Sequence, residues 1–186
     1  MSHDSSLPSD APLVDDAVVQ RVVAAGLERG ADFAELFVEE KRSSSALLDD
    51  GRVEELTSGR DRGAGVRVVV GDSTGFAHTS DLSEQGLLAA ARTAAAAARG
   101  SGSGTTVVAL DRVDAPRPNT ARLQPGEVPK PRKVELLVAA DEMARSEGAA
   151  ITQVAARYAA SRRRILVANS AGTLAGDDQV KTLFSV

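Results

Sequence analysis

Three stretches of the chain place hydrophobic residues at the spacing of an amphipathic helix. Helices are predicted over about residues 13–29, 81–99 and 131–147, each followed by a glycine suited to a helix end: Gly30, Gly100 and Gly148. The second helix is expected to begin near Asp81 or Ser83, because Asp81 and Glu84 stand at capping-box spacing. The third is expected to bury a face made of Val134, Leu137, Val138 and Ala144.

Elsewhere hydrophobic and polar residues alternate, as in strands with one buried face. Short strands are predicted over about residues 34–39, 44–48, 53–56, 64–70, 74–79, 152–158, 165–168 and 180–186. Turns are indicated at Asp50-Gly51, at Gly71-Asp72 and over Asn169 to Gly172. Because tight hairpins join antiparallel neighbours, the expected fold class is α+β, with helices packed on mostly antiparallel sheets.

Composition along the chain suggests two small α+β units. Residues 1–12 are polar and acidic, which indicates a disordered start and not a secretory signal. Residues 13–100 form the first predicted domain, and residues 101–130 are expected to be a Gly/Ser/Pro-rich linker. The second unit is predicted over residues 131–186. Its last strand, Val180 to Val186, runs to the final residue, so we expect a longer protein in which this unit is cut mid-strand.

Charge and composition exclude several functions. The net charge is −4 and the pI is about 5.3, whereas a general nucleic-acid binder is usually basic. Aromatic residues make up only 3% of the chain, which disfavours platforms for stacking bases. Without cysteine there is no disulfide and no thiolate metal ligand. No apolar run approaches the roughly 20 residues that span a bilayer, and a cytoplasmic protein is expected.

Candidate catalytic residues are few. The two histidines, His3 and His78, are far apart in sequence, and neither has an identifiable second metal ligand. Ser73 lies in a predicted hairpin turn, not in the strand-to-helix turn of a nucleophile elbow. The glycines of Gly63-Ala64-Gly65 open a strand, whereas a phosphate-binding loop opens a helix. We expect these glycines to permit a bulge or close backbone packing.

Clustered charges are interpreted as surface. The adjacent acidic pairs are Glu39-Glu40, Asp49-Asp50, Glu54-Glu55 and Asp177-Asp178. Neighbouring strand residues point to opposite faces, so such a pair is poorly placed to share a proton or a metal ion. The basic run Arg162-Arg163-Arg164 is too short to indicate nucleic-acid binding. From the residues alone, no catalytic, cofactor-binding or metal-binding position is predicted.

Two segments resemble the TldD/PmbA family, which has also been called "modulator of DNA gyrase". One joins Gly63-Ala64-Gly65-Val66-Arg67, Gly71 to Ala77 and Asp81-Leu82-Ser83, and the other is Ile165 to Ala175. Gly30 to Leu36 is also similar to the family's first strand. The order and spacing fit from Leu13 to Val186. The form Thr74-Gly75-Phe76-Ala77 is more similar to TldD than to its partner PmbA (TldE).

The resemblance implies a zinc metallopeptidase that works as a heterodimer of two related subunits on unfolded or short peptides, including precursors under maturation. In this family the TldD subunit binds the metal through a His-Glu-x-x-x-His motif and a distant Cys, normally downstream of the region resembled here. No position of this chain matches that motif. The resemblance therefore implies the N-terminal, non-catalytic region of a TldD-like subunit. Zinc is expected only in the full-length protein, with a PmbA/TldE-like subunit and a peptide as partners.

Two other interpretations stay open. The chain could be a stand-alone binding or regulatory module without catalytic activity, which a downstream metal motif in the same reading frame would exclude. It could also regulate DNA gyrase, as the older family name suggests. The acidic pI argues against direct contact with DNA, so that alternative requires binding to the gyrase protein itself. No membrane partner is expected.

Overall fold

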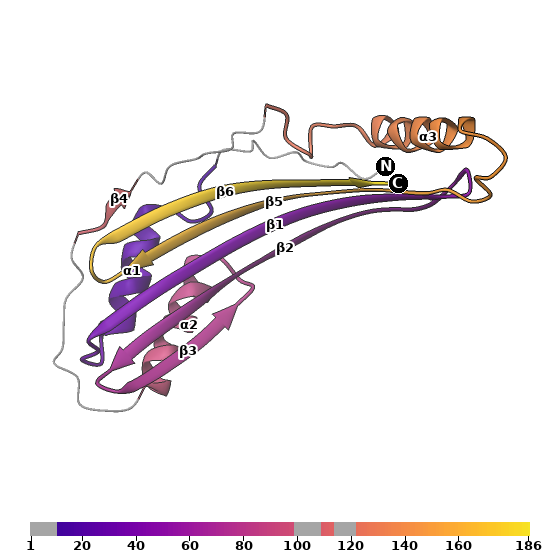
Figure 1. Ribbon diagram of the computed structural model, residues 1–186. Coiled ribbons are helices and arrows are strands. Elements are labelled where there is room, and N and C mark those ends of the chain that lie inside the picture. The colour runs from indigo at the N-terminus through magenta and orange to yellow at the C-terminus, as the bar shows by residue number, and fades with distance from the viewer. Residues whose placement is uncertain (1–10, 99–108, 114–121) are drawn as a thin grey trace. The chain divides into compact units, whose positions relative to one another are not determined.

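The computed structural model describes residues 11–98, 109–113 and 122–186. Its elements are α1 (Asp16–Leu27), β1 (Phe33–Asp49), β2 (Arg52–Val70), β3 (Ser73–Thr79), α2 (Glu84–Ala97), β4 (Asp111–Val113), α3 (Lys130–Ser146), β5 (Ala155–Asn169) and β6 (Thr173–Ser185) (Figure 1). The strands form one mixed sheet in the order β3-β2-β1-β5-β6-β4. The predicted α+β class is confirmed.

The turns define the strand directions. Asp50 and Gly51 both have positive φ, 47° and 77°, as a tight hairpin of the primed type requires. This hairpin joins β1 to β2, and Gly71-Asp72 joins β2 to β3 in an antiparallel pair. Residues 170–172 connect β5 to β6. The short strand β4 pairs in parallel with β6, which makes the sheet mixed.

Four strands are much longer than predicted, among them β6, which begins at Thr173 and not at residue 180. β1 joins the predicted strands at 34–39 and 44–48, and β2 joins those at 53–56 and 64–70. β5 likewise runs through the predicted gap between residues 158 and 165. The gaps carry polar residues on both faces, so the alternation is lost there. Backbone pairing with the neighbouring strand continues regardless of side-chain polarity.

The chain forms two compact units that are interleaved in sequence. The first unit comprises residues 1–39, 63–114 and 165–176, and the second comprises residues 40–62, 115–164 and 177–186. Strands β1, β2, β5 and β6 each contribute residues to both units. Each unit has its own hydrophobic cluster.

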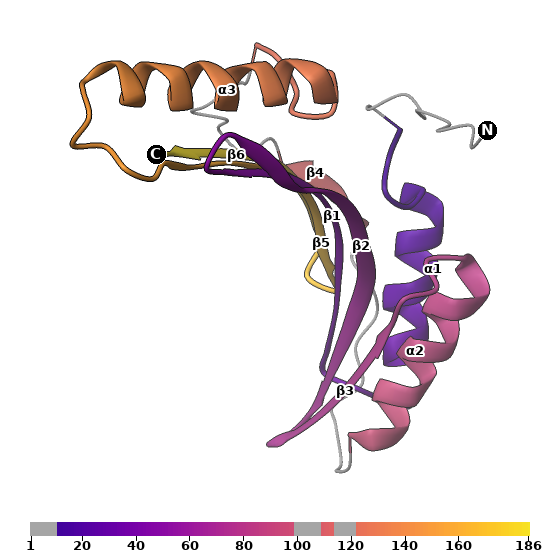
Figure 2. The same ribbon diagram turned by 90° about the vertical axis from the view of Figure 1, so that its right-hand side faces the viewer.

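In the first unit α1 and α2 lie side by side on one face of the sheet (Figure 2). The strand residues beneath them are fully buried, among them Leu36, Val38, Val66 and Val68. The N-cap of α2 is Ser83, whose Oγ accepts a hydrogen bond from the Gly86 N–H at 3.2 Å. The expected Asp81–Glu84 capping box is therefore wrong. Asp81 accepts from the Ser83 N–H instead, and Glu84 pairs with Arg21 at 2.6 Å.

In the second unit α3 covers a small cluster of buried residues: Ala46, Leu48, Leu137, Ala156, Tyr158 and Ala160. The buried face of α3 matches the predicted one only at Leu137. It contains Lys133, Leu137 and Asp141, which follow one another at intervals of four residues, whereas Val138 is exposed. The prediction chose the apolar residues of the helix, but contacts with the strands decide which face is buried.

Candidate functional site

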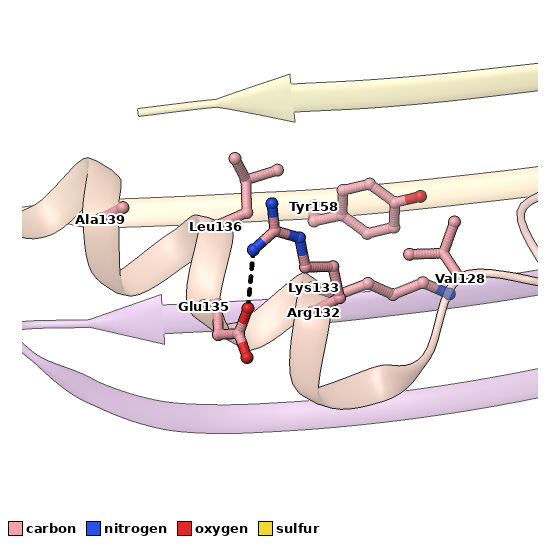
Figure 3. A pocket seen from close by; sticks show the side chains of 7 residues that line it. All are labelled: Val128, Arg132, Lys133, Glu135, Leu136, Ala139 and Tyr158. Carbon is pink, nitrogen blue, oxygen red and sulfur yellow. Dashed lines mark hydrogen bonds and ion pairs between the residues drawn. The ribbon is translucent and has the colours of Figure 1, made fainter.

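A hollow of about 210 Å³ lies between α3 and the sheet of the second unit (Figure 3). We call it the helix pocket. It is lined by Val128, Arg132, Lys133, Glu135, Leu136, Ala139 and Tyr158. The side chains of Lys133 and Tyr158 lie next to each other, and Lys133 Nζ is 5.4 Å from the centre of the tyrosine ring. Arg132 and Glu135 form an exposed ion pair at 2.8 Å.

Lys133 is a buried cation held by neutral oxygens. Its Nζ donates to Ser44 Oγ and to the carbonyl of Pro125, each at 3.1 Å. Burial lowers the pKa of Lys133, and the positive charge of Lys130 lowers it further. An amine with a lowered pKa is suited to base or Schiff-base chemistry. Among the described residues, however, no carboxylate or histidine bonds to Nζ, so the contacts indicate a structural anchor between α3, β1 and the residues before α3.

A second hollow, of about 700 Å³, lies along four strands of the second unit. We call it the strand trough. Its lining residues are Lys41, Ser43, Ser44, Ser45, Thr57, Arg157, Ala159, Ala160, Ser161, Val180, Lys181, Thr182 and Leu183. The hydroxyl groups of Ser45 and Thr57 are hydrogen-bonded at 2.6 Å, which links β1 to β2 within the trough.

Glu40 forms the centre of a polar cluster that the sequence analysis missed. It is only 5% exposed. Its carboxylate accepts from Arg42 Nε at 3.1 Å and from Arg60 Nε at 2.8 Å. Burial alone would raise the pKa of Glu40, but the hydrogen bonds and charges of the two arginines outweigh it, and the pKa is lowered. Interpreting Glu40 as solvated surface was therefore wrong.

Members of three other charged clusters also pair with specific partners, whereas Glu54 and Glu55 are exposed, as expected. Asp178 binds Arg162 through two hydrogen bonds from Nε, at 2.9 and 3.0 Å. Asp50 accepts from Arg145, and Asp49 accepts from the side-chain amide of Gln153. Each of these contacts joins residues distant in sequence. No spacing rule applied to one segment identifies such partners.

The structure brings none of the candidate chemical residues into one site. His78 is exposed on β3, opposite Gly65 of β2, and its ring stacks on Phe76 at 6.4 Å between centroids. Ser73 begins β3 directly after the turn. A Cβ on Gly63 would lie 3.2 Å from the Thr79 backbone oxygen, so the expected close backbone packing is confirmed at this glycine, whereas a Cβ on Gly65 would meet the Phe76 ring at 3.0 Å. His3 lies outside the described residues.

The described residues do not form a recognisable metal site. They contain no group of three or more His, Asp or Glu side chains arranged to hold an ion. His78 has an aromatic ring as its side-chain neighbour, which does not fit the N, O or S donor sets that bind zinc. The helices of the described part are also too short or too polar to cross a membrane.

Comparisons with known proteins agree with this fold. Residues 34–98 match the family described as "PmbA/TldA metallopeptidase domain 1", and residues 123–186 match "PmbA/TldA metallopeptidase central domain". The chain is 31% identical over 150 residues to the "Metalloprotease TldD homolog" of Haemophilus influenzae, covering 80% of this chain and 31% of that protein. It is 32% identical over 152 residues to a "Metalloprotease" of Methanothermobacter thermautotrophicus, covering 80% and 32%.

Among solved structures, TldE from Thermococcus kodakarensis superposes with a TM-score of 0.70 at 17% identity, over 90% of this chain and 38% of that one. At this identity the likeness concerns the fold alone. The two family matches and the metalloprotease relatives define the class as a metallopeptidase-type protein. The chain belongs to the PmbA/TldD family and corresponds to its N-terminal region. It spans about a third of the length of these curated relatives.

Proposed function

We propose that this chain is the N-terminal, non-catalytic region of a TldD-type zinc metallopeptidase subunit that acts in the cytoplasm. The observation that carries the proposal is the match to two consecutive domains of the family, at 31–32% identity to relatives named metalloproteases. Its substrates are unfolded or short peptides, including precursors under maturation. Zinc is held by residues outside this chain.

The part of β6 in the second unit supports a role in contacting a peptide or a partner subunit. β4 pairs with β6 only at residues 173–175, so within the described part of the chain the outer edge of β6 is unpaired beyond this point. Leu183 and Phe184 are also exposed, at 56% and 41%. An extended peptide binds to such an edge by adding a strand to the sheet. A PmbA/TldE-like subunit would be the protein partner.

The test compares two deletions of seven residues in the protein at its cellular length. Removing residues 180–186 is expected to abolish peptide cleavage or assembly with the partner subunit. Removing residues 2–8 is expected to change neither. Cleavage assays and size-exclusion chromatography with light scattering measure both properties. Unchanged cleavage and assembly after removal of residues 180–186 would refute the role of this strand.

The non-catalytic assignment is tested separately. An immunoblot against residues 13–100 is expected to detect a native protein much heavier than 19.2 kDa. His78→Ala in that protein is expected to leave zinc content and peptide cleavage unchanged. Loss of bound zinc in His78→Ala would contradict the proposal. A native band at 19.2 kDa would favour the alternative, a stand-alone binding module without catalytic activity.

A further inference from the structure

The strand trough is lined by positive charge without compensating negative charge. Lys41 on β1, Arg157 on β5 and Lys181 on β6 all line it, and its lining contains no Asp or Glu. All three cations are exposed. Among the described residues, no carboxylate forms an ion pair with any of them.

Several arginines of the same unit are instead paired with carboxylates. Arg42 and Arg60 bind Glu40, Arg145 binds Asp50 and Asp141, and Arg162 binds Asp178. Three cations around one hollow whose lining has no acidic residue create a local excess of positive charge. This local excess of positive charge does not reflect the chain as a whole, whose net charge is −4. A negatively charged ligand would balance this charge.

The other lining groups fit an extended peptide. Small residues, Ser43, Ser45, Ala159 and Ser161, lie between the cations, so a main chain can approach the sheet closely. The hydroxyl groups of the three serines can donate and accept hydrogen bonds, as peptide groups require. A volume of about 700 Å³ lies within the range of ligand-binding sites. The lining contains no aromatic side chain, whereas single-stranded nucleic acids are bound through stacked bases.

We propose that the strand trough binds an acidic peptide segment, whose carboxylates pair with Lys41, Arg157 and Lys181. The choice of a peptide as occupant rests on the proposed function, whereas the preference for negative charge rests on the trough alone. The trough thus selects acidic segments among the peptides that reach the protein. Its cations position the peptide and take no part in bond cleavage.

The experiment measures peptide binding by fluorescence anisotropy with the protein at its cellular length. Three labelled peptides of equal length are compared, built from Ser with Glu, Gln or Lys. The Glu peptide is expected to bind most tightly, and its affinity should fall as salt is raised, because salt screens exposed charges. Replacing Lys41, Arg157 and Lys181 together by Gln should weaken its binding about tenfold, given the modest strength of each exposed ion pair.

A matched variant separates the trough from the overall charge. Replacing Arg29, Arg52 and Arg92 by Gln changes the net charge equally, and these exposed arginines do not line the trough. This variant is expected to bind the Glu peptide within about twofold of the unmodified protein, since distant exposed charges are screened. A variant with Lys41→Arg and Lys181→Arg should also retain binding, because it keeps both charges. Circular dichroism checks that each variant is folded.

Equal affinity for the Glu and Gln peptides would overturn the proposal, as would an equal loss in the two triple variants. Tighter binding of a single-stranded oligonucleotide of the same charge would reassign the trough to nucleic acid. Peptide binding is measured here without cleavage. A protein that binds acidic peptides through the trough but, together with its partner subunit, cleaves no peptide would refute the proposed peptidase and leave this inference intact.

Discussion

The two units bury different kinds of residues. In the described part of the first unit, a cluster of 22 buried residues consists entirely of Val, Leu and Ala. The cluster in the second unit has six residues, and this unit also buries Glu40, Lys133 and Asp141. The first unit is therefore stabilised mainly by hydrophobic burial. The second depends far more on specific polar contacts, which contribute less per residue.

This difference matches what each unit exposes. The second unit contains the strand trough, the unpaired segment of β6 and a β2 segment, residues 52–62, in which every residue is exposed. Open strands with polar faces leave backbone and side-chain groups available for a ligand. We infer that the first unit acts as a scaffold and the second as a binding surface.

The largest effects are expected from truncating one central leucine in each unit. Leu36 and Leu137 are both 0% exposed, and replacing either by Ala should cost about 2–5 kcal/mol. Leu137→Ala should speed hydrogen exchange mainly in α3, because it removes one of only six core residues. Leu36→Ala should speed exchange in α1 and β1. Hydrogen exchange followed by mass spectrometry measures both.

If Leu137→Ala exposed the amides of α1 and α2 as much as those of α3, the two units would unfold as a single cooperative body. The division into scaffold and binding surface would then have no basis in local stability.

Glycine substitutions are expected to reveal a smaller difference in stability between the two units. A Cβ on Gly75 of β3 would lie 2.0 Å from the Ala94 carbonyl oxygen of α2, so Gly75→Ala must displace that helix. We expect the free energy of unfolding to fall by about 1–3 kcal/mol, which is typical of overpacking. A Cβ on Gly59 of β2 would meet only Ser43 Oγ at 3.5 Å, an ordinary contact. Gly59→Ala should therefore change the free energy of unfolding little, and chemical denaturation would show it.

If Gly59→Ala lowered the free energy of unfolding as much as Gly75→Ala does, the looser packing of the second unit would be contradicted. Peptide binding offers a second measurement. Gly75→Ala lies far in sequence from the trough residues and is expected to leave affinity for the Glu peptide unchanged where the protein remains folded.

The sequence predicted the parts of this fold that depend on local patterns. The helices were predicted because their apolar spacing extends over several turns, and the hairpins because Asp50-Gly51 and Gly71-Asp72 favour positive φ. The continuity of β1 was not predicted. Glu40 interrupts the hydrophobic alternation, and its burial depends on Arg60, which the fold brings close from 20 positions away.

The strand trough was not predicted for the same reason, because its residues come together only in the folded sheet. The cations of the strand trough come from β1, β5 and β6, which adjoin one another in the sheet although Lys41 and Arg157 are far apart in the chain. Strand order is a long-range property that a pattern in one segment does not contain. Lys133 had a local signal, because it lies four residues before Leu137 on the same face of α3. It was not among the four residues predicted to form the buried face of this helix.

Glu40→Gln tests whether ion pairing stabilises the second unit. The pKa of Glu40 is lowered in the folded protein, so its contribution is complete above the ordinary pKa of a glutamate and is lost as pH falls through the folded value. The two arginines are nearly half exposed, so solvent screens the pairs, and we expect a loss of about 1 kcal/mol at neutral pH. Urea denaturation at several pH values measures it.

The matched control is Glu54→Gln, because Glu54 is exposed on β2 and pairs with no described residue. It is expected to leave stability unchanged at every pH. If Glu40→Gln were as stable as the unmodified protein at neutral pH, the buried carboxylate would contribute only local order.

The smallest effect on stability is expected from replacing Lys133. Its pKa is lowered by burial and by Lys130, so the folded protein releases the proton at a lower pH than the unfolded chain does. Stability should therefore rise as pH increases from the folded pKa towards the ordinary lysine value of about 10.4. Lys133→Met should abolish this rise, while at neutral pH the lost hydrogen bonds and the relieved burial of charge should cancel within about 1 kcal/mol.

Lys130→Gln is expected to show an alkaline rise in stability between those of the unmodified protein and Lys133→Met. Removing the neighbouring charge should raise the pKa of Lys133 towards its ordinary value and reduce the alkaline rise in stability without abolishing it. The unmodified protein, Lys130→Gln and Lys133→Met should thus show progressively flatter stability curves between neutral and alkaline pH. An unchanged rise in Lys133→Met would mean that another group titrates there, and the second unit would tolerate its buried cation without measurable cost.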